Sequence, residues 1–563
     1  MDKLGFMRNK IGLVIFLFFV VVGVFFRLWR LDRAPISLFG DEIDVGLQGY
    51  SILTTGRDYL GNSLPIMFHS FSEYRLPMQL YIVVPFVKLF GLNEIGVRGP
   101  AVLSGLLSLI IFYFLVKELC NKKIAAIATV FLTFSPWHFN FSRQANDAGI
   151  LLPFVLAGTL FFVKGLKKYK YLFLSAIFFA LSFYTYAIAA VFTPVFVLPL
   201  TIIYLKEIFR YGFKKLSLVV LLGFVVFLPY LVFTLRGVTK ERFSVISVSS
   251  GLSVFQEVVD KRRWSDSILT RVLYNTKTIS IDRAVNNYLM SFSSTFLFSL
   301  GDPNMRQGIE GFGQMYCFEI LFLFAGIAYA FFTDSKNSKK NYLAILCWML
   351  VAPIPSSLTK DGGYHAARLI LMLPPLVLFS SIGFEYISSK LMVKKGLIGK
   401  VVFVGFILFM LFDYVKFMHR YFVVWPNESW RFWHYGYKDT LRYVKDQEQN
   451  YSRVVFNSTY EPMLPRFLFY YQYDMNKFQK EFMDDKFTNN VIARVNGFKL
   501  GEKYIFGELV KPIEDLSDKS TLVVASAERD ITDPTIFGGS RLKLLYNNFS
   551  PTGVPIFYVF TGK

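Results

Sequence analysis

Long apolar runs separated by short polar connections dominate the first three quarters of the chain. Most of the runs approach the ~20 residues that a helix needs to cross a bilayer. The pattern predicts about eleven membrane-spanning helices, at residues 11–28, 99–118, 123–138, 149–165, 171–187, 189–206, 216–235, 316–333, 341–356, 367–387 and 399–417.

The connections between these runs alternate between two compositions. One set is basic, with its lysines and arginines clustered at residues 117–123, 164–170, 206–215, 336–340 and 390–400. The other set is rich in Tyr, Trp, His, Ser and Asp, and lies at residues 29–98, 136–148, 184–188, 236–315, 356–366 and 418–563. Because cytoplasmic loops carry the excess of Lys and Arg, we expect a cytoplasmic N-terminus and an extracytoplasmic second set.

Two apolar runs need a separate interpretation. Residues 11–28 are followed by FRLWRLDRAP rather than by a small-residue cleavage site, so we expect a retained helix and not a signal peptide. Residues 76–91 are short and contain two prolines and a lysine. A crossing there would move every later basic loop outside, so we expect a re-entrant or interfacial segment.

The tail, residues 418–563, is more polar than the rest. It contains strand-like runs at 453–458, 521–527, 541–546 and 555–560, and a helical pattern at 435–447. The predicted fold is therefore a polytopic α-helical membrane protein of about 11–13 transmembrane helices with a small C-terminal extracytoplasmic α/β domain. The predicted division is a transmembrane domain at 1–417, with outer loops 29–98 and 236–315, and a domain at 418–563.

Composition supports a membrane protein. Of 563 residues, 54% are hydrophobic and 18% are charged, which excludes intrinsic disorder and disfavours a soluble multidomain enzyme. The net charge of +21 comes mainly from the membrane flanks, so we expect no nucleic-acid partner. Three cysteines without a CxxC spacing indicate neither a disulfide framework nor a zinc site.

Candidate chemistry gathers in the predicted outer loops. Asp41 and Glu42 begin a helical pattern just after the first run. A helix start favours anions, so the pair is either a plain helix cap or a general base at the membrane surface. Asp58, in TGRDYLG, is either a turn residue bonding its own backbone or a substrate ligand.

The other outer loops add polar side chains on the same side. A single interfacial basic residue is often only a membrane anchor, whereas several converging loops with Arg, His and Tyr indicate a substrate site. The candidates for the donor phosphate are Arg75, Arg143 and Arg368, and those for the rest of the substrate are Asp58, His138, Asp147, Tyr184, Tyr186, Arg306 and His365.

This set of residues suits the transfer of a sugar from a lipid phosphate. Arginine binds an anionic leaving group in a two-pronged way, and a carboxylate takes the proton of the incoming hydroxyl or amine. Asp41 and Glu42 are the candidates for this catalytic role. No nucleotide-binding motif and no metal cage is evident, so we expect no cofactor, although Asp41, Glu42 and Asp44 could hold a divalent cation in principle.

Several stretches resemble a known family. The chain is similar to the polyprenyl-phosphate-dependent GT-C glycosyltransferases, above all to the protein O-mannosyltransferase group (glycosyltransferase family 39) and the lipid A aminoarabinose transferases. The similar stretches spread over most of residues 11–440, and lie at 38–61, 89–108, 135–149, 182–187, 352–375 and 432–439.

The resemblance implies roles for particular residues. Asp41 matches the family's catalytic aspartate, with Glu42 as its partner. Arg75 precedes Pro77 where aminoarabinose transferases have Lys-Pro-Pro, and His365 and Arg368 lie in a segment that resembles the family's last active-site loop. The resemblance also implies inversion at the sugar carbon and no required metal.

Two other functions fit part of the pattern. A glycan polymerase or ligase would share the outer-face site. A transporter for lipid-linked glycans would place ionisable residues at mid-membrane in matched repeats, whereas these runs are nearly free of charge and show no repeat. We therefore expect a glycosyltransferase of the plasma membrane. Its acceptor is a protein, a glycolipid or a polysaccharide.

Overall fold

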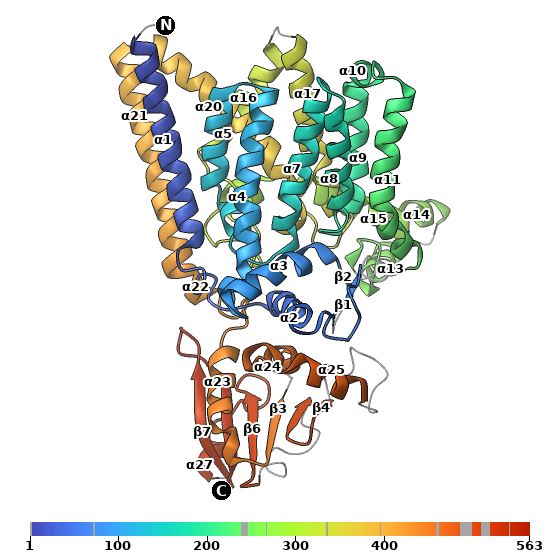
Figure 1. Ribbon diagram of the computed structural model, residues 1–563, viewed down its shortest axis with the longest axis vertical. Coiled ribbons are helices and arrows are strands. Elements are labelled where there is room, and N and C mark those ends of the chain that lie inside the picture. The colour runs from blue at the N-terminus through green and yellow to red at the C-terminus, as the bar shows by residue number, and fades with distance from the viewer. Residues whose placement is uncertain are drawn as a thin grey trace. The chain divides into compact units, whose positions relative to one another are not determined.

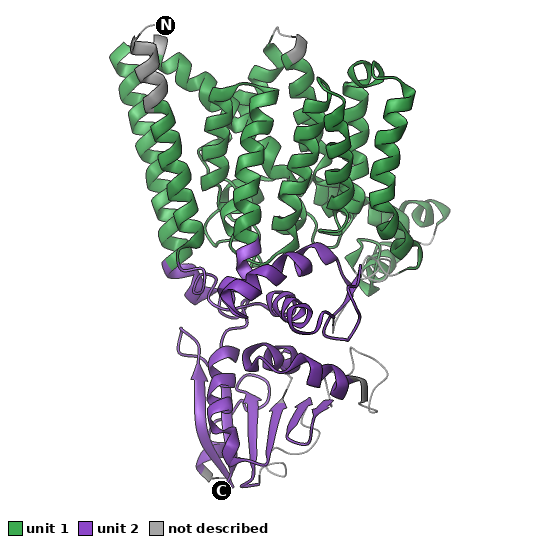
Figure 2. Cartoon of the chain, viewed as in Figure 1, with its two compact units in different colours: residues 1–29, 101–422 green, residues 30–100, 423–563 purple. Residues whose placement is uncertain are grey.

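In the computed structural model the described residues are 3–70, 74–237, 246–265, 267–333, 336–394, 396–457, 461–484, 498–507, 518–539 and 541–563. They form two compact units, each assembled from two separate stretches of chain (Figure 2). Unit 1 contains residues 1–29 and 101–422, and unit 2 contains residues 30–100 and 423–563. Glu73, a polar residue of the first predicted outer loop, lies outside the described residues.

Unit 1 is a bundle of long apolar helices (Figure 1). Each of the eleven predicted runs falls on one of them, and the helices are α1 (Lys3–Leu28), α4 (Glu94–Leu119, which begins in unit 2), α5 (Lys122–Phe134), α7 (Asp147–Gly165), α8 (Lys170–Ser182), α9 (Ala189–Ile203), α11 (Phe213–Leu235), α16 (Glu319–Phe332), α17 (Lys336–Val351), α20 (Leu373–Lys394) and α21 (Gly396–His419).

The length and composition of these helices fit a membrane. Among the described residues, five helical stretches are long and apolar enough to span one: Glu94–Leu119, Asp147–Gly165, Phe213–Leu235, Ala366–Met392 and Gly396–Glu428. Five shorter helices are also apolar. The predicted polytopic helical membrane fold is confirmed.

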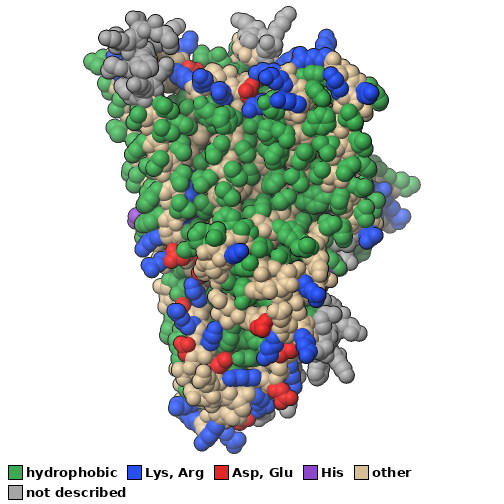
Figure 3. Space-filling view, viewed as in Figure 1, with side chains coloured by type: hydrophobic (Ala, Val, Ile, Leu, Met, Phe, Trp, Pro, Cys, Tyr) green, Lys and Arg blue, Asp and Glu red, His purple; other side chains and the backbone are tan. Residues whose placement is uncertain are grey.

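The surface of unit 1 is a hydrophobic belt with basic residues gathered at one end (Figure 3). Three ion pairs tie the predicted basic connections together at that end. Lys123 contacts Glu385 at 3.0 Å, Lys167 contacts Glu118 at 2.7 Å and Lys340 contacts Glu207 at 2.5 Å. We call this the basic end of unit 1. The connections predicted to lie outside leave the opposite end.

The shorter elements of unit 1 lie between the long helices. They are α6 (Pro136–Phe141), α10 (Leu205–Phe209), α13 (Leu252–Arg262), α14 (Ile268–Leu273), α15 (Thr276–Met290), η1 (Thr295–Ser299), α18 (Ile354–Ser357), α19 (Ala366–Leu369) and η2 (Ile370–Met372); η3 (Arg420–Val424) leads into unit 2. Most of these elements belong to the segments predicted as outer loops.

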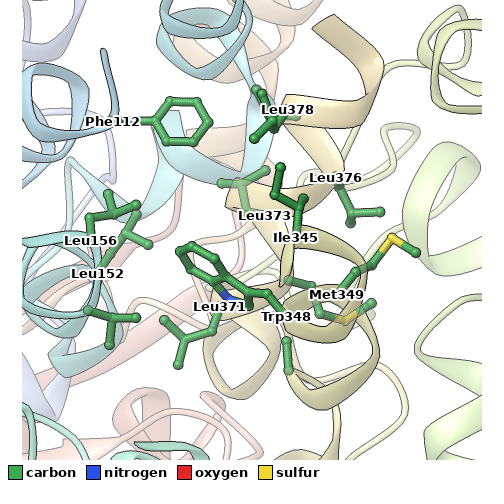
Figure 4. Packing of buried hydrophobic residues seen from close by; sticks show 14 of the residues in the cluster. Phe112, Leu152, Leu156, Ile345, Trp348, Met349, Leu371, Leu373, Leu376 and Leu378 are labelled. Carbon is green, nitrogen blue, oxygen red and sulfur yellow. The ribbon is translucent and has the colours of Figure 1, made fainter. Parts of the chain in front are cut away.

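Large aliphatic and aromatic side chains fill the interior of unit 1. Figure 4 shows Phe112, Leu152, Trp348 and Leu373 packed against one another from different helices. Lipid tails are as apolar as these side chains, so apolar surface alone does little to hold helices together in a membrane. The helices are held instead by the close contacts between their side chains. The close packing fixes the ends of the helices, and with them the loops that carry the candidate site.

The N-terminal part of unit 2 is built around α2 (Gly40–Thr55) and α3 (Pro77–Phe90), which are joined through the short antiparallel pair β1 (Phe68–His69) and β2 (Tyr74–Arg75). The two helices approach so closely that a Cβ on Gly49 of α2 would lie 2.4 Å from Val83 of α3. The apolar run 76–91 is thus a helix of unit 2. Its predicted re-entrant or interfacial position stays a prediction.

The C-terminal part of unit 2 is an α/β domain with a mixed six-stranded sheet in the order β4-β5-β3-β6-β8-β7. The three central strands β5, β3 and β6 are parallel, and the outer ones are antiparallel. The strands are β3 (Arg453–Asn457), β4 (Phe498–Leu500), β5 (Tyr504–Gly507), β6 (Thr521–Ser526), β7 (Leu542–Phe549) and β8 (Pro555–Gly562).

The helices of this domain are α22 (Trp425–Glu428), α23 (Tyr437–Gln447), η4 (Glu448–Asn450), α24 (Met463–Tyr471), α25 (Met475–Asp484) and α27 (Ile536–Gly539). All four predicted strands and the helical pattern at 435–447 are present. The sequence patterns missed β4, β5, α24 and α25.

One hydrophobic core joins the two stretches of unit 2. Leu47 and Tyr59, from the first stretch, are buried with Phe467 and Val454 of the second. A Cβ on Gly46 of α2 would lie 2.5 Å from the ring of Phe469 in α24, so α2 and α24 meet where a larger side chain would not fit. The predicted division at residue 417/418 assigns residues 30–100 to the transmembrane domain. In the structure, residues 30–100 belong to the same compact unit as the C-terminal domain.

Candidate functional site

Asp41 lies in the first turn of α2, where the N-terminal end of the helix favours a negative charge. Its side chain is 57% exposed, and one carboxylate oxygen lies 3.6 Å from Nη2 of Arg75. Arg75 also donates through Nη1 to the backbone oxygen of Asp41, at 3.2 Å. Asp41 is therefore held in place through its backbone while its carboxylate remains open to an incoming group.

Arg75 is itself held by a buried ion pair with Asp44. Nη1 of Arg75 donates to Oδ2 of Asp44 at 3.0 Å, and the Tyr59 hydroxyl donates to Oδ1 at 2.8 Å. Burial raises the pKa of the Asp44 carboxyl, while the Arg75 guanidinium and the Tyr59 hydroxyl bond favour its ionised form. Arg75, predicted as a donor-phosphate contact, is thus already engaged with carboxylates and only 8% exposed.

Glu42 has a different environment from its neighbour Asp41. Its side chain is 3% exposed, and Arg98 donates to both carboxylate oxygens, through Nε to Oε1 at 3.1 Å and through Nη2 to Oε2 at 2.9 Å. The backbone N–H of Phe39 donates to Oε2 as well. Both oxygens accept hydrogen bonds from the protein, so Glu42 holds the start of α2 in place. Its predicted catalytic role stays a prediction.

Asp58 holds a turn. It is fully buried, and it accepts hydrogen bonds from the backbone N–H groups of Leu60 and Asn62 at 3.0 and 2.8 Å and from the Asn62 side chain at 3.0 Å. The turn interpretation therefore accounts for these hydrogen bonds of its carboxylate, and the predicted role of Asp58 as a substrate ligand stays a prediction.

In unit 1 the structure brings three of the predicted loops together. Asp302 accepts from the backbone N–H of Ala366 at 2.8 Å, and Gln307 accepts from that of Ala367 at 3.2 Å. From the third loop, Gln144 donates to the backbone oxygen of Arg306 at 3.0 Å. The segments 136–148, 301–313 and 356–368 thus form one cluster at the end of unit 1 opposite the basic end.

This loop cluster presents positive charge. Arg368 is half-buried and donates through Nη1 to the Thr359 hydroxyl at 2.7 Å. Burial, followed by the charges of Arg368 and Arg306, lowers the pKa of His365 to about 3, so this imidazole is neutral near pH 7. Burial raises the pKa of Asp302 to about 6. Two guanidinium groups and a neutral imidazole suit an anionic ligand.

Two other predicted ligands of unit 1, Arg143 and His138, interact with other groups of the protein. Arg143 is fully buried and donates to the backbone oxygens of Phe26, Arg27 and Trp29 at the end of α1, the last at 2.9 Å. His138 is also buried, and its Nδ1 lies 2.9 Å from Nη2 of Arg27. Arg143 thus caps the end of α1, and its predicted contact with the donor phosphate stays a prediction.

Three candidates remain, of which Tyr184 and Tyr186 lie outside the three segments of the loop cluster and Asp147 lies at the end of segment 136–148. Tyr184 donates its hydroxyl to the backbone oxygen of Val226 at 2.7 Å and so ties α8 to α11. Tyr186 is partly buried against the hydrophobic core, and Asp147 stands at the first position of α7 after the cap Asn146. Their predicted contact with substrate stays a prediction.

Sequence patterns did not reveal several residues that shape these clusters, above all Arg98, Asp44, Tyr59, Asp302 and Gln307. Arg98 stands in a mostly apolar stretch, NEIGVRGPAVL, where a lone arginine signals a buried partner. The spacing of Asp44 three residues after Asp41 could have indicated a second carboxylate on the same helical face.

The three carboxylates at the start of α2 lie beside arginines. Glu42 contacts Arg98, Asp44 contacts Arg75, and Asp41 lies 3.6 Å from Arg75. Among the described residues no group of three or more His, Cys, Asp or Glu side chains is placed to hold a metal ion.

Comparison with known proteins gives one family match. Residues 74–273 match the family model of dolichyl-phosphate-mannose-protein mannosyltransferases. The match includes Arg75 and Arg98 and begins after Asp41. No curated protein sequence matches the chain.

The chain was also compared with solved structures. The structure of ArnT from Cupriavidus metallidurans bound to undecaprenyl phosphate is 12% identical, covers 97% of each chain and has a TM-score of 0.52. The Archaeoglobus fulgidus oligosaccharyltransferase tethered with an acceptor peptide is 12% identical, over 99% of this chain and 75% of that one, with a TM-score of 0.49. The likeness to ArnT shows a common fold along nearly the whole chain.

Proposed function

We propose that this membrane glycosyltransferase of the GT-C class moves a sugar from a polyprenyl-phosphate donor to an acceptor nucleophile, with Asp41 as the general base. The observation that carries the proposal is the contrast between neighbouring carboxylates. Asp41 is 57% exposed, whereas Glu42 and Asp44 are buried and paired with arginines. Only one carboxylate of the group is therefore open to a substrate.

The chemistry follows from these positions. The Asp41 carboxylate accepts the proton of an acceptor hydroxyl or amine as the acceptor oxygen or nitrogen bonds to the anomeric carbon. The bond from that carbon to the phosphate oxygen breaks, and the electron pair leaves with the polyprenyl phosphate. Attack from the face opposite the leaving group inverts the sugar carbon. Arg75 keeps the backbone of Asp41 fixed during this step.

The donor phosphate needs a separate set of contacts. Arg368 and Arg306, in the loop cluster of unit 1, supply guanidinium groups for an anion, and neutral His365 adds no charge that would need compensation. Charge-assisted hydrogen bonds from arginine to a phosphate contribute about 1.5–3 kcal/mol each. The family match to mannosyltransferases that use a polyprenyl-phosphate sugar supports a donor of this class.

The proposed orientation places the loop cluster outside the cell. The basic connections share one end of unit 1, and cytoplasmic ends of membrane proteins carry the excess of Lys and Arg. The opposite end, with the loop cluster, then faces the extracytoplasmic side of the plasma membrane. The acceptor is a protein, a glycolipid or a polysaccharide that reaches that side.

The test is transfer by the purified full-length protein in lipid nanodiscs. Radiolabelled polyprenyl-phosphate sugars, one sugar at a time, are incubated with membrane extract as the acceptor source, and the labelled product is identified by mass spectrometry. Transfer from at least one donor, lost in Asp41→Asn, is expected. Absence of transfer from every polyprenyl-phosphate sugar, with transfer from a nucleotide sugar, would overturn the proposal.

A further inference from the structure

Unit 1 contains an apolar cavity of about 540 Å³ apart from the loop cluster. Its walls come from α1, α5 and α21, with additional residues at the start of α16 and in the middle of α20. Ile15 and Phe18 of α1, and Leu411 and Val415 of α21, line the cavity and are also exposed on the hydrophobic belt. The cavity is therefore continuous with the surface that faces lipid.

The cavity is elongated along the helices. Its lining extends from Gly12 to Val22 in α1, from Ala126 to Phe134 in α5 and from Ile407 to Val415 in α21. At a rise of about 1.5 Å per residue, these stretches are about 12–15 Å long. Half of a bilayer core of about 30 Å is about 15 Å, so the cavity has the length of one leaflet.

The polar groups of the cavity all lie at one of its ends. Phe134 ends α5, Glu319 begins α16 and Tyr414 is near the end of α21, so this is the end opposite the basic end. The hydroxyl of Tyr414 is buried and has no hydrogen-bond partner among the described residues. A buried hydroxyl without a partner costs free energy, which an acceptor oxygen on a bound molecule would remove.

We propose that this cavity binds one acyl chain of a glycerophospholipid from the leaflet at that end, with the ester carbonyl accepting a hydrogen bond from Tyr414. Water does not fill an apolar cavity, and the lining atoms lose dispersion contacts while the cavity is empty. A long polyprenyl chain exceeds one leaflet in length, which favours the acyl chain.

The test uses a photoactivatable phosphatidylethanolamine with a diazirine in its acyl chain. The full-length protein is placed in nanodiscs of phosphatidylethanolamine and phosphatidylglycerol, irradiated and digested, and the labelled residues are found by mass spectrometry. We expect labels on the cavity-lining residues of α5 and α21, including Val130 and Met410. Labels spread evenly over the exposed belt would overturn the proposal.

Two filling variants sharpen the test from opposite walls. Ala126→Phe in α5 and Ile407→Phe in α21 each place a ring in the cavity and should lower its labelling by about tenfold, because each methylene denied burial weakens binding about fourfold. Ala328→Phe is the matched control, since Ala328 is exposed on α16 and does not line the cavity. Equal labelling in all three variants would contradict the proposal.

Two further measurements test the role of the Tyr414 hydroxyl and the identity of the bound chain. Tyr414→Phe removes only the hydroxyl, so it should weaken the labelling of the cavity while the melting temperature stays close to that of the wild type. Excess unlabelled polyprenyl phosphate should leave the labelling unchanged, and its displacement of the acyl probe would assign the cavity to a polyprenyl chain and overturn the proposal. If one filling variant fails to fold, the other variant and the competition decide.

Discussion

Arg98 binds Glu42 through two hydrogen bonds and, with its remaining N–H groups, donates to the backbone oxygens of Leu31, Pro35 and Ser37. All of these distances lie between 2.6 and 3.1 Å. One fully buried guanidinium therefore joins the segment before α2 to the first turn of α2. The position of Asp41, next to Glu42 in the same turn, depends on it.

We predict that Arg98→Met lowers the free energy of unfolding by about 3–5 kcal/mol, because it leaves the Glu42 charge buried without a partner. Thermal unfolding followed by intrinsic fluorescence measures the change. Arg453→Met is the matched control in the same unit, since Arg453 pairs with Asp518 and both are about half exposed. Its cost should stay at or below about 1 kcal/mol, and an equal cost for the two variants would contradict the prediction.

For Asp41 we expect Asp41→Asn to lower turnover by about 10²–10⁴ with little change in stability. Asparagine has the shape of aspartate but cannot take a proton from the acceptor, and loss of one exposed charge in the first helical turn costs about 0.3–1 kcal/mol at most. Initial rates with a saturating polyprenyl-phosphate sugar, together with melting temperatures, separate catalysis from folding. A rate close to that of the wild type would leave Asp41 with only a structural role in the first turn of α2.

Arg368→Gln should weaken binding of the donor by about 10–100-fold, as expected when one charge-assisted contact of about 1.5–3 kcal/mol is lost. Equilibrium binding of a fluorescent polyprenyl-phosphate sugar in nanodiscs measures it. Arg453→Gln serves as the control, because Arg453 lies in the C-terminal α/β domain and its pair with Asp518 is about half exposed. Unchanged donor affinity in Arg368→Gln would remove this residue from the phosphate site.

The affinity for the donor should increase as the pH falls through about 6. The pKa of Asp302 is raised to about 6, so the carboxyl is ionised near pH 7 and neutral near pH 5. Loss of this negative charge close to Arg368 strengthens the attraction of the cluster for an anion. His365 does not titrate in this range because its pKa is about 3, and the phosphodiester of the donor stays ionised.

Donor titrations at several pH values check this, with Asp302→Asn as the comparison. The variant should bind at every pH with the higher affinity that the wild type reaches at low pH. A wild-type affinity that is the same at pH 5 and pH 7, or a pH dependence that persists in Asp302→Asn, would contradict the prediction.

The orientation of the chain can be checked with reporter fusions. A fusion after Lys168, in a basic connection, should report the cytoplasm, and a fusion after Gly436, at the start of α23, should report the outside. The alternation of basic and aromatic connections along eleven helices is the reason. Two reporters on the same side would refute the proposed topology.

Helices and most strands could be predicted because their signal is local. The run 399–417 is mostly apolar and falls within the helix α21, and the pattern TLVVAS is the strand β6. β4 and β5 have only three and four residues, too few for a period to emerge. Their place in the sheet depends on pairing with β3, which a local pattern does not contain.

The candidate site could be predicted only in part, for a related reason. Asp41 can be recognised because it begins a helix, but the sequence does not show that Glu42 is paired with Arg98, 56 residues away. Arg143 was chosen for its charge and position in a loop, and its actual partners are carbonyl groups at the end of α1, 114–117 residues away. The sequence shows which residues are charged, whereas the fold determines which groups they contact.

Unit 2 is assembled from two distant stretches of chain, and this has a consequence for the synthesis of the protein. The side chain of Gln479 in α25 donates to Ser51, Thr55 and the backbone oxygen of Asp58, and the contact with Ser51 joins residues 428 positions apart. A ribosome produces α2 long before α25, so the surroundings of Asp41 are completed only after residues 475–484 have been made. A nascent or truncated chain that ends before α24 would carry the Asp41 carboxylate without the neighbours that the second stretch of unit 2 supplies.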